Sequence, residues 1–341
     1  MKIKTILAAG AMSVAAIAAN NAHAGAVLDG IKAKGFVQCG VNTGLPGFSA
    51  ANAEGKWEGI DVDVCRGIAA ALLGDANKVQ YTPLTAAQRF TALQSGEIDI
   101  LSRNTTATLT RDVKLGLTFL GINYYDGQGF LIPKALGVSS ATELDGATVC
   151  VEPGTTTELN LADYFRAKGM SFEPVVIENI NEATAAFFSG RCDVYTTDAS
   201  GLASIRTTMA PNPDDYMILP EIISKEPLGP AVAQGDEQWA DIGRWALAAM
   251  IEAEEYGVTM ANVDEMKSST NPGIQRLLGV SPGMGEALGL DEEWAYRIIK
   301  QVGNYGESYE KNVTAKLGVE RGLNALWTMV VCNMLGRFAN I

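Results

Sequence analysis

The sequence contains a single histidine, His23, and it lies within the first 24 residues. These residues, MKIKTILAAGAMSVAAIAANNAHA, place Lys2 and Lys4 ahead of an alanine-rich apolar run and end in the A-x-A pattern of a cleaved secretory signal peptide. We therefore expect residues 1–24 to be a signal peptide and the mature chain to lack imidazole. This excludes a Ser-His-Asp triad and every mechanism that uses histidine as base, proton shuttle or metal ligand.

Long apolar runs are also missing beyond this segment. No later stretch approaches the roughly 18 uninterrupted apolar residues that a membrane helix needs, and no cysteine stands at the predicted cleavage point to carry a lipid anchor. Basic residues number 26 against 39 acidic ones, and cleavage leaves 24 against 39, a formal charge of about −15. Nucleic acid and anionic membranes are poor partners for that charge. We expect a protein exported to the periplasm that binds no nucleic acid.

Cysteine occurs five times, without a CxxC motif, which disfavours a redox or zinc role. We predict no metal and no cofactor. Cys39 ends a predicted strand and Cys65 lies in the following helix, while Cys150 and Cys192 fall in two strands of a later unit. In an oxidising compartment we predict the pairs Cys39–Cys65 and Cys150–Cys192, which leaves Cys332 unpaired, although spacing alone does not fix connectivity.

The apolar pattern predicts two successive βαβαβ units. About 317 mature residues exceed what one hydrophobic core usually serves, so two lobes are expected, each with a mainly parallel sheet. The first unit comprises predicted strands at 36–41, 79–82 and 98–101 with helices at 60–72 and 85–96; the second comprises strands at 148–151, 175–177 and 192–196 with helices at 158–168 and 182–188.

Two connecting segments, residues 123–134 and 223–232, are candidate crossings between the lobes, because short extended chain absorbs hinge rotation. We expect residues 25–126 to form the first part of lobe 1 and residues 127–228 to form lobe 2. Residues 229–341 should then return to lobe 1 and add a helical carboxyl-terminal extension. A helical stripe that begins at Trp239 should pack on lobe 1.

Residues 92–111, ALQSGEIDILSRNTTATLTR, join a predicted helix and strand to a hydroxyl-rich segment that stops at Arg111. The guanidinium of Arg111 matches the two oxygens of a carboxylate, and Asn104 and Thr106 add short polar groups. The cluster follows the carboxyl end of a strand, where open α/β sheets bind ligands. On composition alone, a solvated threonine-rich loop with a surface arginine explains the segment equally well.

Seven motifs follow one another along the mature chain: GIDVDVCRGIAAALLG at 59–74, RFTALQSGEIDIL at 89–101, TTATLTR at 105–111, YYDGQGF at 124–130, GTTTE at 154–158, GRCDVYTTD at 190–198 and SKEPLGPAV at 224–232. In this order they resemble the motifs of the polar amino-acid-binding proteins of bacterial ABC importers. The region with VGNYGESYEKN at 302–312 and RGLNALW at 321–327 resembles the subgroup of general L-amino-acid-binding periplasmic proteins. The resemblance implies a two-lobed periplasmic-binding-protein fold of type II.

The resemblance also implies roles for five residues. Arg111 matches the arginine that holds the ligand's α-carboxylate, and Thr106 matches the hydroxyl that assists it. Thr156 matches a carboxylate-binding position at a helix amino terminus, where free N–H groups favour anions. Asp198 matches the acid that accepts the ligand's ammonium, and Asn104 matches a small polar position near that ammonium.

The resemblance does not assign the residues that select the ligand's side chain as directly as those that hold its carboxylate and ammonium. Asn42, Gln128 and Glu152 are candidates for this selection, and for each of them an ordinary structural role is the favoured alternative. Relatives carry an aromatic residue near the position of Leu45, where this chain offers Leu45 and, nearby, Phe48.

A second departure from the subgroup also bears on the pocket, because related chains commonly have Trp at the position of Ala107. The size and preference of the pocket therefore stay open.

The function that the resemblance implies is the substrate-binding component of an ABC importer. It would bind free L-amino acids, of broad or polar specificity, as a monomer and deliver them to the permease subunits. The alternative is a periplasmic enzyme on the same fold, such as a dehydratase of a prephenate-like acid. Such an enzyme needs a carboxylate with a pKa raised by burial, and Glu152 is the candidate.

The carboxyl terminus departs from the family after NALW. Relatives continue with a segment like TNGGLQYAPP, whereas this chain reads TMVVCNMLGRFANI from Thr328 onward. A shift of one base would convert NGGLQYA into MVVCNML. We therefore hypothesise a frameshifted tail, which would also explain the unpaired Cys332.

Overall fold

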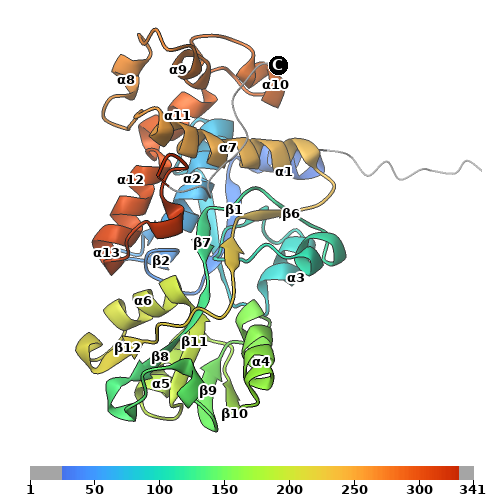
Figure 1. The fold of residues 1–341 in the computed structure, drawn as a ribbon. Helices are drawn as coiled ribbons and strands as arrows, with labels where there is room; N and C mark the ends of the chain where they lie inside the picture. Colours follow the sequence, from blue (N-terminus) through green and yellow to red (C-terminus); the bar gives the residue numbers. More distant parts are fainter. Residues whose placement is uncertain (1–24, 330–341) are drawn as a thin grey trace, which may run out of the picture.

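The computed structural model describes residues 25–329. The predicted signal peptide, Cys332 and the hypothesised frameshift from residue 330 onward lie outside the described residues. Within them the chain forms two sheets of five strands, each flanked by helices, one above the other in Figure 1. No helix of this part of the chain is both long and apolar enough to cross a membrane.

The sheet of lobe 1 has the strand order β4-β1-β5-β14-β6. Its first three strands are parallel, so their carboxyl ends meet at one edge, whereas β14 runs antiparallel to β5 and β6. The bounds are β1 Val37–Asn42, β4 Val79–Leu84, β5 Ile100–Leu101, β6 Leu117–Phe119 and β14 Ala231–Ala233; a separate hairpin pairs β2 Ala50–Ala51 with β3 Trp57–Glu58.

The sheet of lobe 2 repeats the arrangement in the order β10-β9-β11-β8-β12. Strands β10, β9 and β11 are parallel, and β8 is antiparallel to β11 and β12. The bounds are β8 Gln128–Pro133, β9 Ala147–Val151, β10 Phe172–Val176, β11 Val194–Asp198 and β12 Tyr216–Ile218. The two mainly parallel sheets confirm the predicted fold class.

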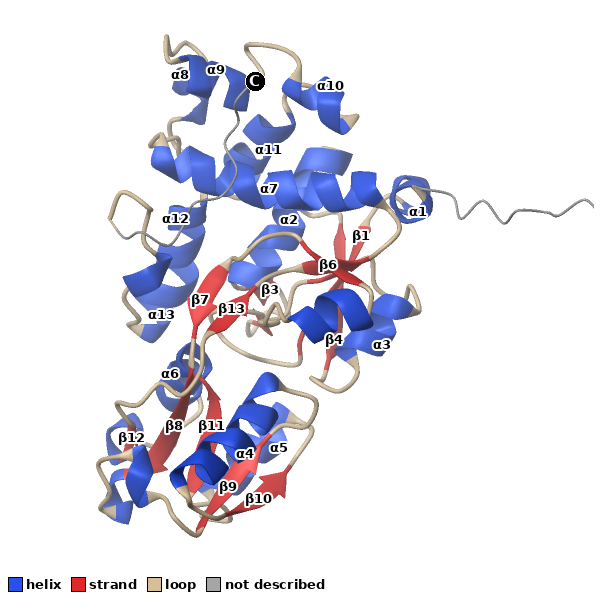
Figure 2. Cartoon of the chain, turned by 45° about the vertical axis from the view of Figure 1, so that its right-hand side comes forward, coloured by secondary structure: helices blue, strands red, loops and turns tan. Residues whose placement is uncertain are grey.

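A two-stranded antiparallel ladder of β7 (Tyr124–Asp126) and β13 (Glu226–Leu228) joins the lobes. We call it the hinge ladder; Figure 2 shows it between the two sheets. Both expected crossing segments contain one of its strands. We keep residues 127–228 as the proposed extent of lobe 2.

Helices cover both sheets. The apolar stripe Ile60, Val64 and Ile68 buries one face of α2, as the 3.6-residue spacing predicts. Trp239 of α7 is fully buried, and its indole N–H donates to the Asp99 carbonyl at 3.0 Å in lobe 1. The helix bounds are α1 Ala26–Lys34, α2 Ile60–Leu73, α3 Arg89–Gln94, α4 Thr156–Lys168, α5 Ile180–Phe188, α6 Ala199–Thr208 and α7 Glu237–Glu255.

The carboxyl-terminal extension packs on lobe 1 and reaches the hinge ladder. Its helices are α8 Val263–Met266, α9 Pro272–Leu277, α10 Met284–Leu288, α11 Trp294–Gln301, α12 Tyr305–Tyr309 and α13 Ala315–Leu317. Arg297 donates to the carbonyls of Ala70 and Ala71 at the end of α2. Asn324 bonds both the N–H (2.7 Å) and the carbonyl (3.1 Å) of Tyr125 in β7, so a side chain takes the place of a further strand there.

Several predicted boundaries were wrong by a few residues. The helix expected over 85–96 is α3, Arg89–Gln94, although Thr85 and Gln88 do exchange the two capping hydrogen bonds at 3.3 Å. The strand expected at 175–177 begins at Phe172, because β10 pairs with the whole of β9. The strand expected at 98–101 is only Ile100–Leu101, since β1 pairs with it over two residues.

Both predicted disulfides are present. Cys39 of β1 bonds to Cys65 of α2 across 26 residues of sequence, with the Cα atoms 6.3 Å apart. Cys150 of β9 bonds to Cys192, just before β11, across 42 residues, with the Cα atoms 5.6 Å apart. Each bridge lies in the core of its own lobe, and all four cysteines are buried.

Loss of either bridge should destabilise the protein by about 2–4 kcal/mol, because each restricts the unfolded chain. We expect the larger loss for Cys150→Ala with Cys192→Ala, which opens the longer loop, than for Cys39→Ala with Cys65→Ala. Urea unfolding of each double variant measures the loss, and wild type in dithiothreitol is the control that loses both bridges. Unchanged stability in either variant would contradict the prediction.

Candidate functional site

A cavity of about 440 Å³, counting the space at its open mouth, lies between the lobes. Lobe 1 lines it from the carboxyl ends of β1 and β5, and lobe 2 from the end of β11 and the start of α4. Seven predicted site residues line it: Asn42, Leu45, Asn104, Thr106, Glu152, Thr156 and Asp198.

The two lobes touch around this cavity. The hydroxyls of Thr106 in lobe 1 and Thr156 in lobe 2 are 3.3 Å apart. On another side, the Ser204 hydroxyl of α6 donates to the Pro46 carbonyl of lobe 1 at 2.8 Å. The cavity is therefore bounded by groups from both lobes, and opening the lobes breaks these contacts.

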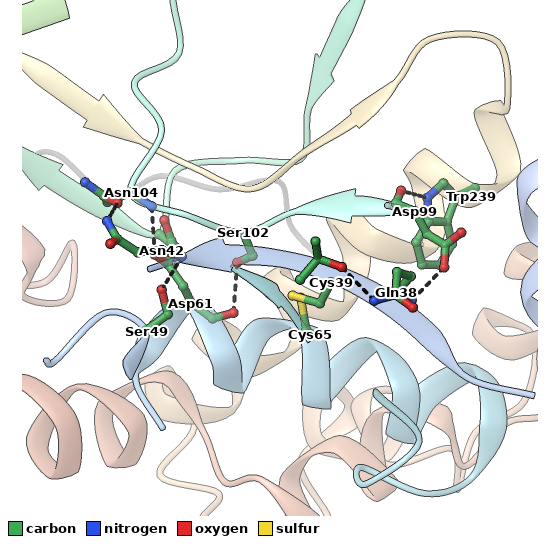
Figure 3. The surroundings of a disulfide bond; sticks show 12 residues. Gln38, Cys39, Asn42, Ser49, Asp61, Cys65, Asp99, Ser102, Asn104 and Trp239 are labelled. Atoms are coloured by element: carbon green, nitrogen blue, oxygen red, sulfur yellow. Dashed lines mark hydrogen bonds between the residues drawn. A yellow bond between two sulfur atoms is a disulfide. The ribbon is translucent and has the colours of Figure 1, made fainter. Parts of the chain in front are cut away.

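Asn104 follows β5 in a backbone conformation with φ +27°, which non-glycine residues rarely adopt but asparagine tolerates. Its N–H donates to Asp61 Oδ2 at 2.7 Å, and its side-chain oxygen accepts from the amide of Asn42 at 3.1 Å (Figure 3). Burial raises the pKa of Asp61 to about 6, opposed by the hydrogen bonds from Asn104 and Asn123 and by the charge of Arg103. The start of α2 thus fixes the polar segment at the cavity.

Arg111 is buried behind Thr106, outside the residues that line the cavity. Its Nη1 donates to the Thr106 carbonyl at 2.8 Å, and its guanidinium lies 4.9 Å from the ring centre of Phe90. Burial lowers the pKa of Arg111 to about 10, while the charges of Glu226 and Asp198 act in the opposite direction. Its predicted contact with a ligand carboxylate stays a prediction.

Asp198 ends β11 and precedes α6, on the lobe 2 side of the cavity. Its Oδ1 atom is buried and has no hydrogen-bond partner among the described residues. Burial raises the pKa of Asp198 well above the usual range, and the negative charges of Asp126 and Glu226 add to the effect; Arg89 and Arg111 oppose it. A buried acceptor without a donor is costly, so this atom fits a cationic donor supplied by a ligand.

Thr156 is the first residue of α4, and the hydroxyl of Thr155 caps that helix by accepting from the Glu158 N–H at 3.0 Å. Gln128 does not line the cavity. Its amide donates to the Thr157 carbonyl of α4 and to the Thr196 hydroxyl of β11, so it links the start of α4 to the sheet of lobe 2. Direct contact between Gln128 and a ligand's side chain stays a prediction.

Glu152 lines the cavity and is buried. Its carboxylate accepts from the Tyr195 hydroxyl at 3.2 Å and lies 3.9 Å from Nη2 of Arg103. Burial raises the pKa of Glu152, while the nearby Arg103 opposes the rise. Leu45 is buried at the cavity wall, whereas Phe48 packs into the core against Tyr124, with ring centres 5.1 Å apart.

Two arginines at the cavity were not predicted. Arg103 immediately precedes Asn104, so the same reasoning about strand ends could have included it. Arg89 begins the motif RFTALQSGEIDIL, but it was not chosen as a site residue because AAQRF reads as the start of a helix with an outward cation. Arg89 is 3% exposed, its Nε has no partner among the described residues, and its Nη1 is 3.5 Å from the Thr105 hydroxyl. Burial lowers its pKa well below the usual value.

Glu226 of β13 was also missed, although its motif SKEPLGPAV was noted. It is 1% exposed and accepts four side-chain hydrogen bonds. The donors are the hydroxyls of Thr106 (2.6 Å), Thr156 (2.8 Å) and Ser224 (2.6 Å) and the amide of Asn160 (2.8 Å). A carboxylate of the chain itself therefore occupies two of the hydroxyls expected to bind the ligand.

Comparison with known proteins adds to this geometry. The model of the bacterial extracellular solute-binding proteins, family 3, matches residues 37–261. The chain is 58% identical to the general L-amino acid-binding periplasmic protein AapJ of Rhizobium johnstonii, with 96% of each chain covered. It is 56% identical to the glutamate/glutamine/aspartate/asparagine-binding protein BztA of Rhodobacter capsulatus, with 94% of this chain and 95% of that one covered.

Among solved structures, an ABC transporter periplasmic binding protein from Brucella ovis, described with glutathione bound, is 58% identical. It covers 89% of this chain and 96% of its own, with a TM-score of 0.86. These findings confirm the resemblance drawn from the motifs. They give no support to the dehydratase alternative, since all three proteins are named as binding proteins.

The conformation of Asn104 can be tested with a matched pair of variants. Asn104→Ala and Asn104→Gly both lose the side-chain amide, but only alanine pays for a positive φ, at about 1–2 kcal/mol. We expect Asn104→Ala to lower the free energy of unfolding by that much more than Asn104→Gly does. Urea unfolding compares them, and equal stability of the two variants would contradict the assigned backbone conformation.

Proposed function

Since the chain belongs to the bacterial extracellular solute-binding proteins, family 3, we propose that it is the periplasmic substrate-binding component of an ABC importer. It binds L-amino acids between its lobes and delivers them to the permease subunits in the inner membrane. The observation that carries this proposal is the buried Oδ1 atom of Asp198, which has no hydrogen-bond partner among the described residues and belongs to the lobe 2 lining of the cavity.

The ammonium of the ligand belongs beside Asp198. A cation placed there supplies the missing donor for Oδ1 and offsets the repulsion from Asp126 and Glu226. Asn104 lies on the opposite wall, with its side-chain oxygen directed at Asn42. Asp198 and Asn104 then both lie at the ammonium end of the ligand.

The α-carboxylate belongs on the side of Thr106 and Thr156, which come from different lobes. Thr106 is bonded to Arg111 through its carbonyl, so the positive charge stands directly behind it. Thr156 begins α4, whose unpaired N–H groups favour an anion. The ligand is therefore held at each end by groups of opposite sign.

The side chain of the ligand faces Arg89 and Arg103, which favours an acidic or amide side chain over a cationic one. Arg103 already lies near Glu152, whereas Arg89 has an Nε without a partner. The relative BztA is named for glutamate, glutamine, aspartate and asparagine, which fits such a wall. AapJ is named as a general L-amino acid binder, so breadth is compatible with the same scaffold.

Because the site is divided between the lobes, ligand binding is coupled to closure of the two lobes. Contacts with lobe 2 are gained only on closure, so the ligand stabilises the closed form by that difference in free energy. The permease can then distinguish loaded from unloaded protein. We further propose a periplasmic monomer that acts without a metal or cofactor and catalyses no reaction.

Binding of the twenty L-amino acids to refolded, ligand-free protein, measured by calorimetry, tests this function. We expect glutamate, glutamine, aspartate and asparagine to bind more tightly than lysine and arginine. The side chain of a lysine or arginine ligand would place a second positive charge beside Arg89, which repels it. The Arg111→Ala variant should lose most of the affinity, since removing one partner of a buried charge pair costs about 2–5 kcal/mol. Binding of keto acids or sugars but of no amino acid would refute the proposal.

The affinity should fall as the pH falls. The pKa of Asp198 is raised, so the group becomes protonated at a higher pH than an ordinary aspartate and then no longer attracts an ammonium. Below that raised pKa, the affinity should drop by up to about tenfold per pH unit, with protons released on binding. Asp126, with a pKa raised to about 6 mainly by burial, titrates together with it.

Calorimetry between pH 5 and 8, in two buffers of different ionisation enthalpy, measures both the affinity and the proton release. The Asp198→Asn variant is the control, which should bind more weakly and with a flatter pH profile. An unchanged wild-type affinity over this range, with no proton exchange, would contradict the assigned ammonium site.

A further inference from the structure

Helix α12 of the carboxyl-terminal extension holds the chain where it enters the hinge ladder. The Tyr305 hydroxyl donates to the Asn123 carbonyl, one residue before β7, at 2.7 Å. The ring of Tyr309 stacks on that of Tyr124, the first residue of β7, with the ring centres 5.9 Å apart and the planes at 5°. All four side chains are buried. The entry to β7 is therefore packed against the extension rather than against lobe 2.

The second residue of β7, Tyr125, is held by Asn324 of the same extension. Its N–H donates to the Asn324 side-chain oxygen at 2.7 Å, and its carbonyl accepts from the Asn324 amide at 3.1 Å. Asn324 is buried, so these two hydrogen bonds are shielded from water and strengthened by the low local dielectric. Because the extension packs on lobe 1, Tyr125 is bonded to the lobe 1 side of the molecule.

The next residue of β7, Asp126, is bonded to lobe 2 instead. Its carboxylate accepts from the N–H of Gly127 at 2.8 Å and from the N–H of Ser200 at 3.3 Å, and it also accepts from the Ser200 hydroxyl. Ser200 lies in the first turn of α6. The carbonyl of Gly127 accepts from the Ala199 N–H of the same helix at 2.8 Å. The attachment of the first crossing thus changes from lobe 1 to lobe 2 between Tyr125 and Asp126.

The second crossing changes lobe within a few residues. Ile223 and Ser224 are bonded to Gln128 of β8 in lobe 2, through the Ile223 N–H at 2.9 Å and the Ser224 hydroxyl at 3.2 Å. Beyond them, the Pro227 carbonyl accepts from the Ala107 N–H of lobe 1 at 2.8 Å. The attachment of this crossing therefore changes between Ser224 and Pro227.

The strand register brings both changes to one level of the hinge ladder. Tyr125 pairs with Pro227, and both are bonded to the lobe 1 side, whereas Asp126 pairs with Glu226, which accepts hydrogen bonds from both lobes. We call the step between these two pairs the pivot step. The ring of Pro227 fixes its φ, so rotation in the second crossing falls on the residues before it.

We propose that the lobes turn about the pivot step, and that Asn324 is a positioning residue that confines the rotation to it. The pivot step lies within two residues of both proposed ends of lobe 2. Asn324 is not among the residues that line the cavity, so it acts on the ligand only through the hinge strand. The effect on affinity rests on the proposed function, whereas the hold of Asn324 on Tyr125 does not.

The effect on affinity has a defined sign. Without Asn324, residues 123–125 can also rotate, so the lobes sample more relative orientations. The orientation that binds the ligand is then a smaller fraction of the whole, and the apparent dissociation constant rises by that factor. Ordering the additional backbone on closure also costs conformational entropy. A residue that only stabilises the extension differs, because its loss lowers the free energy of unfolding and leaves the affinity unchanged.

The Asn324→Ala variant tests the proposal, because it removes both hydrogen bonds to Tyr125. The matched control is Gln301→Ala. Gln301 of α11 also bonds one N–H and one carbonyl of lobe 1, those of Ala76 (2.7 Å) and Gly74 (3.0 Å), but beyond the end of α2 and away from the hinge ladder. Hydrogen exchange at the Tyr125 amide, followed by NMR, measures the hold on the strand. Calorimetry with glutamate and glutamine measures the affinity, and urea unfolding measures the stability.

We expect the Tyr125 amide to exchange about tenfold faster in Asn324→Ala than in wild type and Gln301→Ala. We expect Asn324→Ala to bind the tightest amino acid about threefold to tenfold more weakly, whereas Gln301→Ala loses stability and keeps the wild-type affinity. Unchanged exchange overturns the hold on the strand. Unchanged affinity in Asn324→Ala, or an equal loss in both variants, overturns the positioning role.

Two further outcomes separate this proposal from the proposed function. If wild type binds no amino acid, the proposed function fails, while exchange at Tyr125 still decides whether Asn324 holds the strand. If Asn324→Ala does not fold, Tyr305→Phe provides a milder variant that removes only the hydroxyl donating to Asn123. It should weaken binding in the same direction, and an unchanged affinity would overturn the positioning of the hinge strand by the extension.

Discussion

The structure depends on one electrostatic constraint: charged side chains are buried between the lobes, and each must be compensated there. Arg89 and Arg103 stand on the lobe 1 wall and Glu152 and Asp198 on the lobe 2 wall. Ionised groups removed from water are costly unless they find partners of opposite sign. The largest opposite charge acting on Arg89 and Arg103 is that of Glu152 in the other lobe, although Asp61 of lobe 1 also acts on Arg103. Contact between the lobes therefore offsets part of the cost of burying these groups.

This constraint explains why so much of the surrounding structure is rigid. The loop that carries Asn104 is bonded to Asp61, which is itself buried and bonded to Asn123 near the hinge ladder. On the outer side, Asn324 of the extension replaces a neighbouring strand for Tyr125. The extension thus restrains one hinge strand while the other, β13, carries Glu226. One strand of the hinge ladder is thus held by the extension, and the other by the hydrogen bonds of Glu226 to both lobes.

A site residue could be predicted from the sequence only where its own stretch of sequence has a recognisable pattern. Asn104 and Thr106 could be found because they follow a strand in one contiguous segment, and Asp198 because it stands at the end of a recognisable motif. Both disulfides could be found because each pair joins elements of the same unit. Arg89 could not be found, since its local sequence describes an ordinary helix start. The structure buries it among residues of both lobes that line the cavity.

Glu226 was missed for a different reason from Arg89. Its motif was noticed, but as a connection, because proline and glycine dominate the local pattern. A hinge is normally treated as a passive segment that absorbs backbone rotation. Glu226 nevertheless contacts both lobes, because its carboxylate accepts from Thr106 of lobe 1 and from Thr156 of lobe 2. The two hydroxyls proposed for the ligand's carboxylate are thus already hydrogen-bonded to a carboxylate of the chain. Hydrogen-bonding capacity at Thr106 and Thr156 is therefore not by itself a measure of affinity, because these groups are not free in the structure.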